Sequence, residues 1–399
     1  MKLIPIGDLC SRISSGGTPS RKRDEYFCLN DTGHPWVKSK ELLDCSIAAT
    51  EETITDEGLK KSAAKYVPAQ TVLVAMYGAN VGQLGWLANP ATVNQAICGL
   101  VADESKADWR YLFYALLQER SKLITKAQGA AQQNLNQDAI RNFELPVPDL
   151  LTQRRIAGIL SAYDDLIENN LRRIKILEEM AQSLYREWFV HFRFPGHESA
   201  KFVDSALGQI PKGWEVKAIS DFGKVVTGKT PSKANEDFFG ENIPFLKTPD
   251  MHGQMFILRT NEYLSTAGAQ SQANKTLPIG SICVSCIGTI GVVSITTEPC
   301  QTNQQINSVV LADDASREFL FFWLREAKQM LENLGSNGAT MGNVNKSKFE
   351  GMKLVCPSGD LLARFHNVTE PMFEQIQRLF RKIQNLRETR DLLLPKLLR

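Results

Sequence analysis

The sequence lacks the features that mark membrane proteins, secreted disulfide proteins and metalloproteins. Over 399 residues it has no apolar run long enough to cross a bilayer, and we expect no signal peptide. Its eight cysteines, at positions 10, 28, 45, 98, 283, 286, 300 and 356, do not have the spacing of a disulfide framework. Its five histidines show no metal-ligand spacing, so we expect no metal site. Together these absences predict a reduced, cytoplasmic protein.

A strong charge of either sign is also missing. The chain has 46 Lys and Arg residues against 44 Asp and Glu residues, a formal net charge of +2. Any surface that attracts nucleic acid must therefore be local. The sequence has no glycine-rich dinucleotide fingerprint and no Asn/Asp-Pro-Pro-Tyr/Phe motif, which an amino-methyltransferase needs. We therefore expect a chain without catalytic residues of its own.

The most regular feature present is a heptad pattern that occurs twice. Residues 149–194 are expected to form one long helix and residues 358–399 a second, because apolar residues recur there every three or four positions. The two apolar seams, broken at Asn170 and Arg390, superimpose at an offset of 209 residues, with Pro395 expected to end the second helix. Their matched positions are Ile167, Ile174, Leu177 and Leu184 in the first helix and Ile376, Ile383, Leu386 and Leu393 in the second. The two helices are expected to pack side by side. The alternative is two unrelated amphipathic helices on separate cores.

The repeat extends beyond the helices. Residues 16–20 (GGTPS) return as 228–232 (GKTPS), residues 94–97 as 303–306, and residues 111–114 as 319–322. The sequence thus predicts an α+β protein with a pseudo-twofold internal repeat, in which two tandem mixed α/β modules are joined by two long antiparallel helices. We expect a first module at 1–148, a long helix at 149–194, a linker at 195–213, a second module at 214–357 and a long helix at 358–399.

The stretches 145–160 (LPVPDLLTQRRIAGIL), 166–192 (LIENNLRRIKILEEMAQSLYREWFVHF) and 202–216 (FVDSALGQIPKGWEV), with the Gly-x-Thr-Pro-Ser loop opening each half, carry a family resemblance. Over its whole length the chain resembles the specificity subunit of type I restriction-modification enzymes. The resemblance implies two target-recognition domains, each reading one part of a bipartite site in double-stranded DNA. One departure is that the final helix lacks the Trp-Phe pair found at 188 and 189, so the two ends of the rod that the paired helices form need not dock partners identically.

The same resemblance implies the partners and cofactors. Two methyltransferase subunits, which bind S-adenosylmethionine, would dock on the chain, and restriction subunits, which hydrolyse ATP with Mg²⁺, would join through them. The resemblance implies that the chain itself has no catalytic site, and we expect it to bind no cofactor.

One segment matches a catalytic motif. Gly223–Thr230 satisfies G-x-x-x-x-G-K-[ST], the phosphate-binding loop of many ATPases. In such a loop the Lys and Thr open a helix, whereas Pro231 follows here at once, and Gly17 stands where the second half has Lys229. An ATP-dependent enzyme built on this segment is one alternative function. A scaffold whose modules bind protein instead of DNA is another.

Comparison of the two halves gives candidates for DNA contact. Residues shared by both copies cannot distinguish two half-sites, so they are expected to hold phosphates or build the fold; the alternative is that they only cap and turn the chain. The candidates for contact with the DNA backbone, which include nearby basic residues, are Thr18, Ser20, Arg21, Lys22, Lys38, Asn94, Gln95, Asn134, Thr230, Ser232, Lys247, Asn303, Gln304, Asn343 and Lys346. Polar residues that differ between matched loops are expected to read bases. These are Ser39, Tyr77, Asn80, Gln132, Gln133, Thr248, His252, Thr289 and Met341.

An aromatic cluster follows the first heptad run. Trp188, Phe189 and Phe192 lie close together at the end of the expected helix. Large apolar side chains at such a place cap a helix pair, dock a partner protein, or do both.

Overall fold

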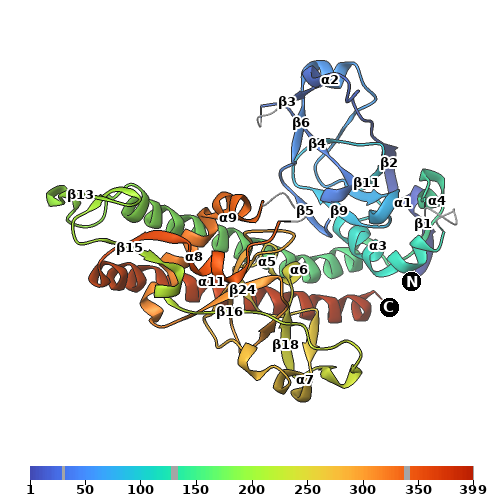
Figure 1. The fold of residues 1–399 in the computed structure, drawn as a ribbon. Coiled ribbons are helices and arrows are strands. Elements are labelled where there is room, and N and C mark those ends of the chain that lie inside the picture. The colour runs from blue at the N-terminus through green and yellow to red at the C-terminus, as the bar shows by residue number, and fades with distance from the viewer. Residues whose placement is uncertain (29–31, 127–133, 337–341, 399) are drawn as a thin grey trace. The chain divides into compact units, whose positions relative to one another are not determined.

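The computed structural model describes residues 1–28, 32–126, 134–336 and 342–398, which form two compact units (Figure 1). Unit 1 consists of Met1–Asn169 together with Ile383–Arg399, and unit 2 of Asn170–Lys382. Each unit therefore contains one copy of the repeated module, together with parts of both long helices.

The first module is built on two five-stranded sheets and a strand pair. One sheet has the order β3 (Phe27–Cys28), β6 (Glu52–Ile54), β4 (His34–Val37), β10 (Ala91–Val93) and β7 (Tyr66–Val67). The other has the order β2 (Cys10–Ser15), β11 (Ile97–Ala102), β8 (Val72–Ala75), β9 (Leu84–Leu87) and β5 (Cys45–Ile47). The antiparallel pair joins β1 (Lys2–Pro5) to β12 (Glu144–Val147). The first and last strands of the module therefore pair with each other.

Strand β8 shows why this sequence forms a central strand. All four of its residues are apolar and buried. Because successive side chains of a strand point to opposite faces, Val72 and Val74 pack into one apolar cluster and Leu73 and Ala75 into another. The sheet is therefore covered on both sides, as a continuous apolar strand predicts.

Helices of the first module pack on this framework. They are α1 (Ile6–Leu9), α2 (Asp56–Lys60), α3 (Trp109–Ile124) and α4 (Gln137–Arg141). Helix α3 begins where Asp108 accepts hydrogen bonds from the backbone N–H groups of Arg110 and Tyr111, at 3.0 and 3.1 Å. Its buried face contributes Tyr111, Phe113 and Tyr114 to the cluster that also contains Val72.

The second module repeats the first. One sheet has the order β16 (Gly223–Thr227), β24 (Ile306–Leu311), β21 (Ile282–Ser285), β22 (Val293–Thr296) and β19 (Phe256–Ile257). The other has the order β17 (Phe239–Gly240), β20 (Glu262–Leu264), β18 (Ile243–Leu246) and β23 (Gln301–Thr302), and β15 (Glu215–Ala218) pairs with β25 (Lys353–Cys356). Strand neighbours match those of the first module one for one, and an isolated bridge between Leu277 and Cys300 stands where the first module pairs β7 with β10. The predicted internal repeat is confirmed.

Helices of the second module follow the same plan with small differences. They are α6 (Thr248–Met251), α7 (Thr266–Gln270), α8 (Arg317–Glu326), α9 (Lys328–Gly335) and α10 (Lys346–Glu350). Where the first module has the single helix α3, the second has α8 and α9, which meet at Ala327.

The two long helices, α5 (Leu150–Tyr185) and α11 (Gly359–Leu397), pack against each other in an antiparallel sense. In unit 1, Ile156 and Leu160 of α5 share a core with Leu394 of α11. In unit 2, the ring of Tyr185 lies 6.5 Å from that of Phe365. Early residues of α5 thus meet late residues of α11, and late residues meet early ones.

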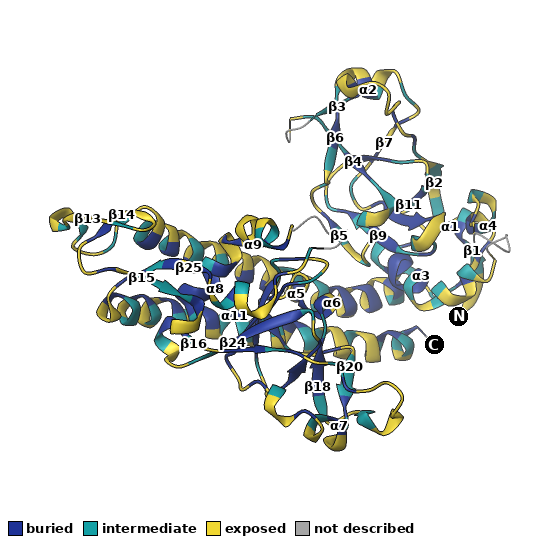
Figure 2. Cartoon of the chain, viewed as in Figure 1, coloured by how far each residue is buried: buried dark blue, intermediate teal, exposed yellow. Residues whose placement is uncertain are grey.

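All eight predicted seam residues are buried or half-buried: Ile167, Ile174, Leu177, Leu184, Ile376, Ile383, Leu386 and Leu393. Figure 2 shows buried and exposed residues alternating around both helices, as expected for helices that pack along one face. The predicted α+β class with two long antiparallel helices is confirmed, and the alternative of two separate amphipathic helices is wrong.

Three element boundaries differ from the sequence-based expectations. Helix α11 continues through Pro395 to Leu397, because Leu394 and Leu398 are buried in the core of unit 1 and this packing holds the last turn. The regular part of α5 ends at Tyr185, and a π-helical turn over Arg186–Val190 follows. The segment 195–213 is more than a linker, since it contains the antiparallel hairpin of β13 (Phe202–Ser205) and β14 (Gly208–Pro211).

Two isoleucines on α5 provide a test of the helix packing. Ile174 is buried in the seam, whereas Ile176 is 54% exposed. We expect Ile174→Ala to lower the free energy of unfolding by about 2–5 kcal/mol through the cavity it leaves. Ile176→Ala, as the control on the same helix, is expected to change it by no more than about 0.5 kcal/mol. Urea unfolding of the full chain measures both, and equal effects would contradict the seam.

Candidate nucleic-acid interface

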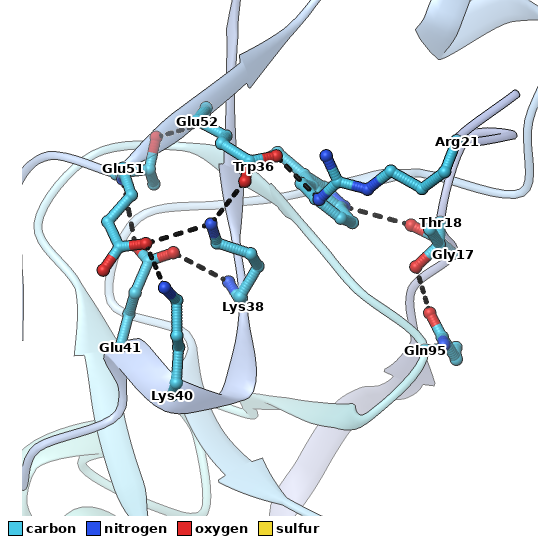
Figure 3. Close-up of polar contacts among 11 residues, drawn as sticks. Gly17, Thr18, Arg21, Trp36, Lys38, Lys40, Glu41, Glu51, Glu52 and Gln95 are labelled. Carbon is cyan, nitrogen blue, oxygen red and sulfur yellow. Dashed lines mark hydrogen bonds and ion pairs between the residues drawn. The ribbon is translucent and has the colours of Figure 1, made fainter. Parts of the chain in front are cut away.

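The loop that opens each module lies against the Asn-Gln segment of the same module. In unit 1 the backbone N–H of Gly17 donates to the backbone oxygen of Val93 at 3.0 Å. The Thr18 hydroxyl donates to the side-chain oxygen of Gln95, as Figure 3 shows. In unit 2 the Thr230 hydroxyl donates in the same way to Gln304, at 2.6 Å. The Gly-x-Thr-Pro-Ser loop and the Asn-Gln segment, which lie far apart in the sequence, therefore contact each other in the same way in both modules.

Glycine is needed where these loops begin because the backbone comes so close. A Cβ atom on Gly16 would lie 1.7 Å from the oxygen of Val93, and one on Gly228 would lie 2.1 Å from the oxygen of Asn303. Neither contact leaves room for a methyl group. The first residue of the loop is thus fixed by packing in both modules.

Both matched lysines have acidic partners inside their own modules. The ammonium group of Lys38 lies 3.0 Å from Glu51 and 2.7 Å from Glu52, and Lys247 forms the matching ion pair with Glu262. Burial alone would lower the pKa of Lys38, but hydrogen bonds to Glu52 and Glu51 outweigh it, so the pKa is raised and the side chain stays charged. Figure 3 shows the ion-paired group. These lysines stabilise the module, and a phosphate would have to compete with carboxylates for them.

Arg21 belongs to the same group. Its guanidinium lies 2.7 Å from Glu52 and 4.3 Å from the centre of the Phe27 ring. Lys346 in unit 2 is likewise paired, 3.1 Å from Glu350, whereas Lys22 lies exposed in a turn. Most of the candidate cations are therefore already neutralised within the fold.

The remaining shared candidates shape the backbone. The side-chain oxygens of Asn94 and Asn303 each accept a hydrogen bond from the N–H two residues later, at 3.1 Å. The backbone oxygens of Ser20 and Ser232 accept from the N–H three residues later. These contacts favour the alternative that the shared residues turn the chain. Their contact with phosphates stays a prediction.

One loop of each module gathers base-reading candidates. The loop between β8 and β9 carries Tyr77 and Asn80, and a backbone bridge joins Tyr77 to Asn134. In unit 2 the loop between β21 and β22 carries the exposed Thr289, and the matching bridge joins Ile287 to Asn343. Each module thus presents the same pair of segments with different side chains, a grouping that the sequence did not reveal.

Glycines give this loop its shape in both modules. Gly78 and Gly82 have φ values of +75° and +78°, and the matching Gly288 and Gly291 have +77° and +85°. Residues other than glycine rarely adopt this conformation. The paired glycines were the sequence signal that could have identified the loop.

The other base-reading candidates differ in how far they are exposed. His252 is exposed just after α6, and Ser39 is half-buried in a 3-10 turn, Ser39–Glu41. Thr248, in the first turn of α6, is only 6% exposed, so this side chain would have to become accessible before it could read a base. Gln132, Gln133 and Met341 lie outside the described residues.

The segment Gly223–Thr230 does not have the shape of a phosphate-binding loop. Its first five residues are strand β16, which pairs with β24 from Gly223 to Thr227. No helix opens at Thr230; the next helical turn is a 3-10 turn at Glu236–Phe238. Phosphate-binding loops need free backbone N–H groups at a helix N-terminus, whereas here the N–H groups of Gly228 and Lys229 donate to the backbone oxygens of Ile306 and Thr302.

The aromatic cluster is used inside unit 2. The ring of Phe189 lies 4.9 Å from the rings of both Phe319 and Phe365, and the ring of Phe192 lies 5.4 Å from that of Trp214. Phe189 is buried and therefore unable to offer its ring to a partner, while Trp188 and Phe192 are half-buried. Capping the helix pair is the role that the contacts support.

Neither a metal site nor a membrane span emerges in the part of the chain that the structure describes. It contains no group of three or more His, Cys, Asp or Glu residues that could hold an ion, and no helix long and apolar enough to cross a bilayer. Burial raises the pKa of the Cys283 thiol to about 12 and that of Cys286 to about 11, so both thiols stay protonated in the core.

Comparison with known proteins places this two-module fold among the DNA-specificity proteins of restriction-modification systems. A family model described as the type I restriction modification DNA specificity domain matches residues 1–179 and again residues 211–360, once for each module. The chain belongs to this family. The predicted resemblance is confirmed.

Individual relatives agree with the family match. The type I restriction enzyme HindI specificity subunit of Haemophilus influenzae is 34% identical over 351 residues, which cover 72% of this chain and 76% of the relative. The MjaIX specificity subunit of Methanocaldococcus jannaschii is 26% identical over 404 residues, covering 99% and 91%. The crystal structure of a type I system S subunit from M. genitalium has the same fold, with a TM-score of 0.63 at 14% identity, covering 100% of this chain and 96% of that one.

Two glycine substitutions test the loop packing. We expect Gly228→Ala to destabilise the chain by about 1–3 kcal/mol, because the new methyl group would collide with backbone atoms. Gly158→Ala is the control: this glycine lies exposed within α5 with open space around it, so alanine should stabilise by about 0.5–1 kcal/mol. Thermal unfolding of both variants decides the matter, and a neutral Gly228→Ala would contradict the close approach.

Proposed function

We propose that this chain is the DNA-reading subunit of a type I restriction-modification enzyme and recognises a bipartite, asymmetric duplex site, one part through each module. The observation that carries the proposal is the matched pair of loops, β8–β9 and β21–β22. They share glycines and backbone bridges but carry different side chains, Tyr77 and Asn80 against Thr289. Equal frameworks with unequal loop side chains suit the reading of two different short sequences.

The proposal includes partners. Two methyltransferase subunits that bind S-adenosylmethionine dock on this chain, and restriction subunits that hydrolyse ATP join through them. This is supported by the names of the relatives, which are specificity subunits of type I restriction enzymes. The chain itself is proposed to be non-catalytic, to bind no cofactor and to act in the cytoplasm, where its DNA substrate is found.

Electrostatics also favour a DNA complex completed by other subunits. Affinity for duplex DNA comes mainly from Lys and Arg residues that neutralise phosphates. Here Arg21, Lys38 and Lys247 already have carboxylate partners, and the net charge is only +2. The isolated chain is therefore proposed to bind weakly, with most of the phosphate contacts supplied by the methyltransferase subunits.

The two alternative functions predict different behaviour. An ATP-dependent enzyme would bind nucleotide at Lys229, yet the segment before it is strand β16. A scaffold that binds only protein would show no DNA shift even with methyltransferase subunits present. A gel-shift titration at stated salt, with and without those subunits, separates the scaffold from the DNA reader.

Exchange of one module tests whether each module recognises its own half of the DNA site. If residues 1–148 are replaced by the corresponding module of another specificity subunit, we expect one half of the methylated sequence to change and the other half to remain. The physical reason is that each module has its own sheets and its own loop pair. Methylation mapping of cells that carry the hybrid enzyme measures this. A change in both halves, or in neither, would refute the proposal.

Single substitutions separate base reading from phosphate contact. Asn80→Ala is expected to cost about 1–3 kcal/mol of binding free energy to the complete methyltransferase complex and to relax preference at one base pair. Lys22→Ala should instead weaken binding to every sequence alike and reduce the salt slope by about 1. Equilibrium titrations against the cognate site and single-base variants distinguish the two, and an Asn80→Ala variant with unchanged sequence preference would remove that residue from the interface.

A further inference from the structure

A polar group of one buried and two half-buried residues joins three helices in unit 1. The hydroxyl of Tyr114 on α3 donates to the carboxylate of Asp164 on α5, and the guanidinium of Arg390 on α11 lies 2.5 Å from the same carboxylate. Tyr114 is 2% exposed, and the side chains of Arg390 and Asp164 are 14% and 22% exposed. We call these three residues the polar triad. Arg390 is one of the two residues that break the heptad seam.

The second module has apolar residues at the same three positions. The repeat offsets of 208 and 209 residues match Tyr114, Asp164 and Arg390 to Phe322, Phe373 and Ala181. All three are buried in unit 2, and the rings of Phe322 and Phe373 pack 5.6 Å apart at 81°. One repeated position therefore carries an ion pair in one module and an edge-to-face aromatic pair in the other.

The seam alone does not distinguish the two helices. Its matched positions carry Ile against Ile and Leu against Leu in α5 and α11. Each module could therefore accept either helix at those positions, including the same helix from a second copy of the chain. Specificity must come from positions at which the wrong pairing is penalised.

The polar triad supplies that penalty. If two first modules paired through α5, Asp164 would face Ala181 of the other copy and be buried without a cation. If two second modules paired through α11, Arg390 would meet Phe322 and Phe373, and of its two carboxylate partners it would keep only the exposed Asp391, its neighbour on α11. Leaving one member of a buried ion pair without its partner is strongly destabilising.

We propose that Tyr114, Asp164 and Arg390 form a pairing lock, which makes the C-terminal half of α11 the segment that the first module accepts and excludes association between like modules of two chains. The lock acts on helix pairing and does not depend on DNA binding. Its partner surface is the matching half helix of the same chain.

The lock can be tested on the full chain cut after folding. A protease site inserted between Ala206 and Leu207, at the exposed turn of the β13–β14 hairpin, leaves two pieces held together by their helices and by the pairing of β13 with β14. Two cut samples of different isotope label are mixed, warmed to allow exchange, and analysed by native mass spectrometry. From the unsubstituted chain we expect complexes with one N-terminal and one C-terminal piece.

The decisive variant gives the first module the residues of the second. Tyr114→Phe, Asp164→Phe and Arg390→Ala together remove this penalty, so pairs of like pieces, absent from the unsubstituted sample, should appear. The ion pairs of Arg186 with Glu326 and of Glu178 with Arg325 still favour unlike pairs, so like pairs should stay below the share of about half that random assortment would give. The control replaces the exposed pair Lys175 and Glu179 on α5 by alanine and should keep unlike pairs only. Like pairs from the unsubstituted chain, or none from the triple variant, would overturn the proposal.

A second measurement uses the uncut chain. Asp164→Ala and Arg390→Ala are each expected to lower the thermal midpoint by about 5 °C, and the double variant to lower it by clearly less than the sum of the two. Additive effects would show that the two side chains do not act as a pair, and would also overturn the lock. A failure of DNA recognition in the methylation mapping would leave both results unaffected.

Discussion

The antiparallel contact between α5 and α11 is the constraint on which both units depend. Each unit takes part of its core from both helices: Ile156 and Leu160 meet Leu394 in unit 1, and Tyr185 meets Phe365 in unit 2. A helix with one apolar face is stable in water only when that face is covered. Neither module can therefore complete its core with its own following helix alone.

The two modules share some positions and differ at others, and the two kinds of position have different roles. The sheets, the loop that begins at Gly16 or Gly228, and the Lys–Glu ion pairs are the same in both modules because they build the framework. The exposed loop side chains differ, and so do the three positions of the polar triad. Shared positions thus maintain the fold. The unequal positions are those that we propose to distinguish base sequences, in the loops, and helices, in the polar triad.

Periodic features of the fold could be predicted from the sequence, because a repeat offset and a heptad pattern depend only on order along the chain. Contacts between distant residues could not. Thr18 and Gln95 are 77 positions apart, and Asp164 and Arg390 are 226 apart, so the sequence marked Arg390 only as a break in the seam. Burial of Thr248 was missed for the same reason: a polar residue in a matched loop looks exposed until the surrounding packing is known. The candidate site was therefore predicted as a set of residues, and its grouping required the structure.

The composition of unit 1 has a consequence for how the protein is made. Its core includes Leu394 and Leu398, yet its sheets lie within the first 147 residues. A ribosome finishes the whole second module before it releases the segment that completes the first. During this time the apolar surface of the nascent first module is uncovered, and we expect chaperones to bind it. A premature stop codon near the end of the gene would therefore destabilise the half of the protein that was synthesised first.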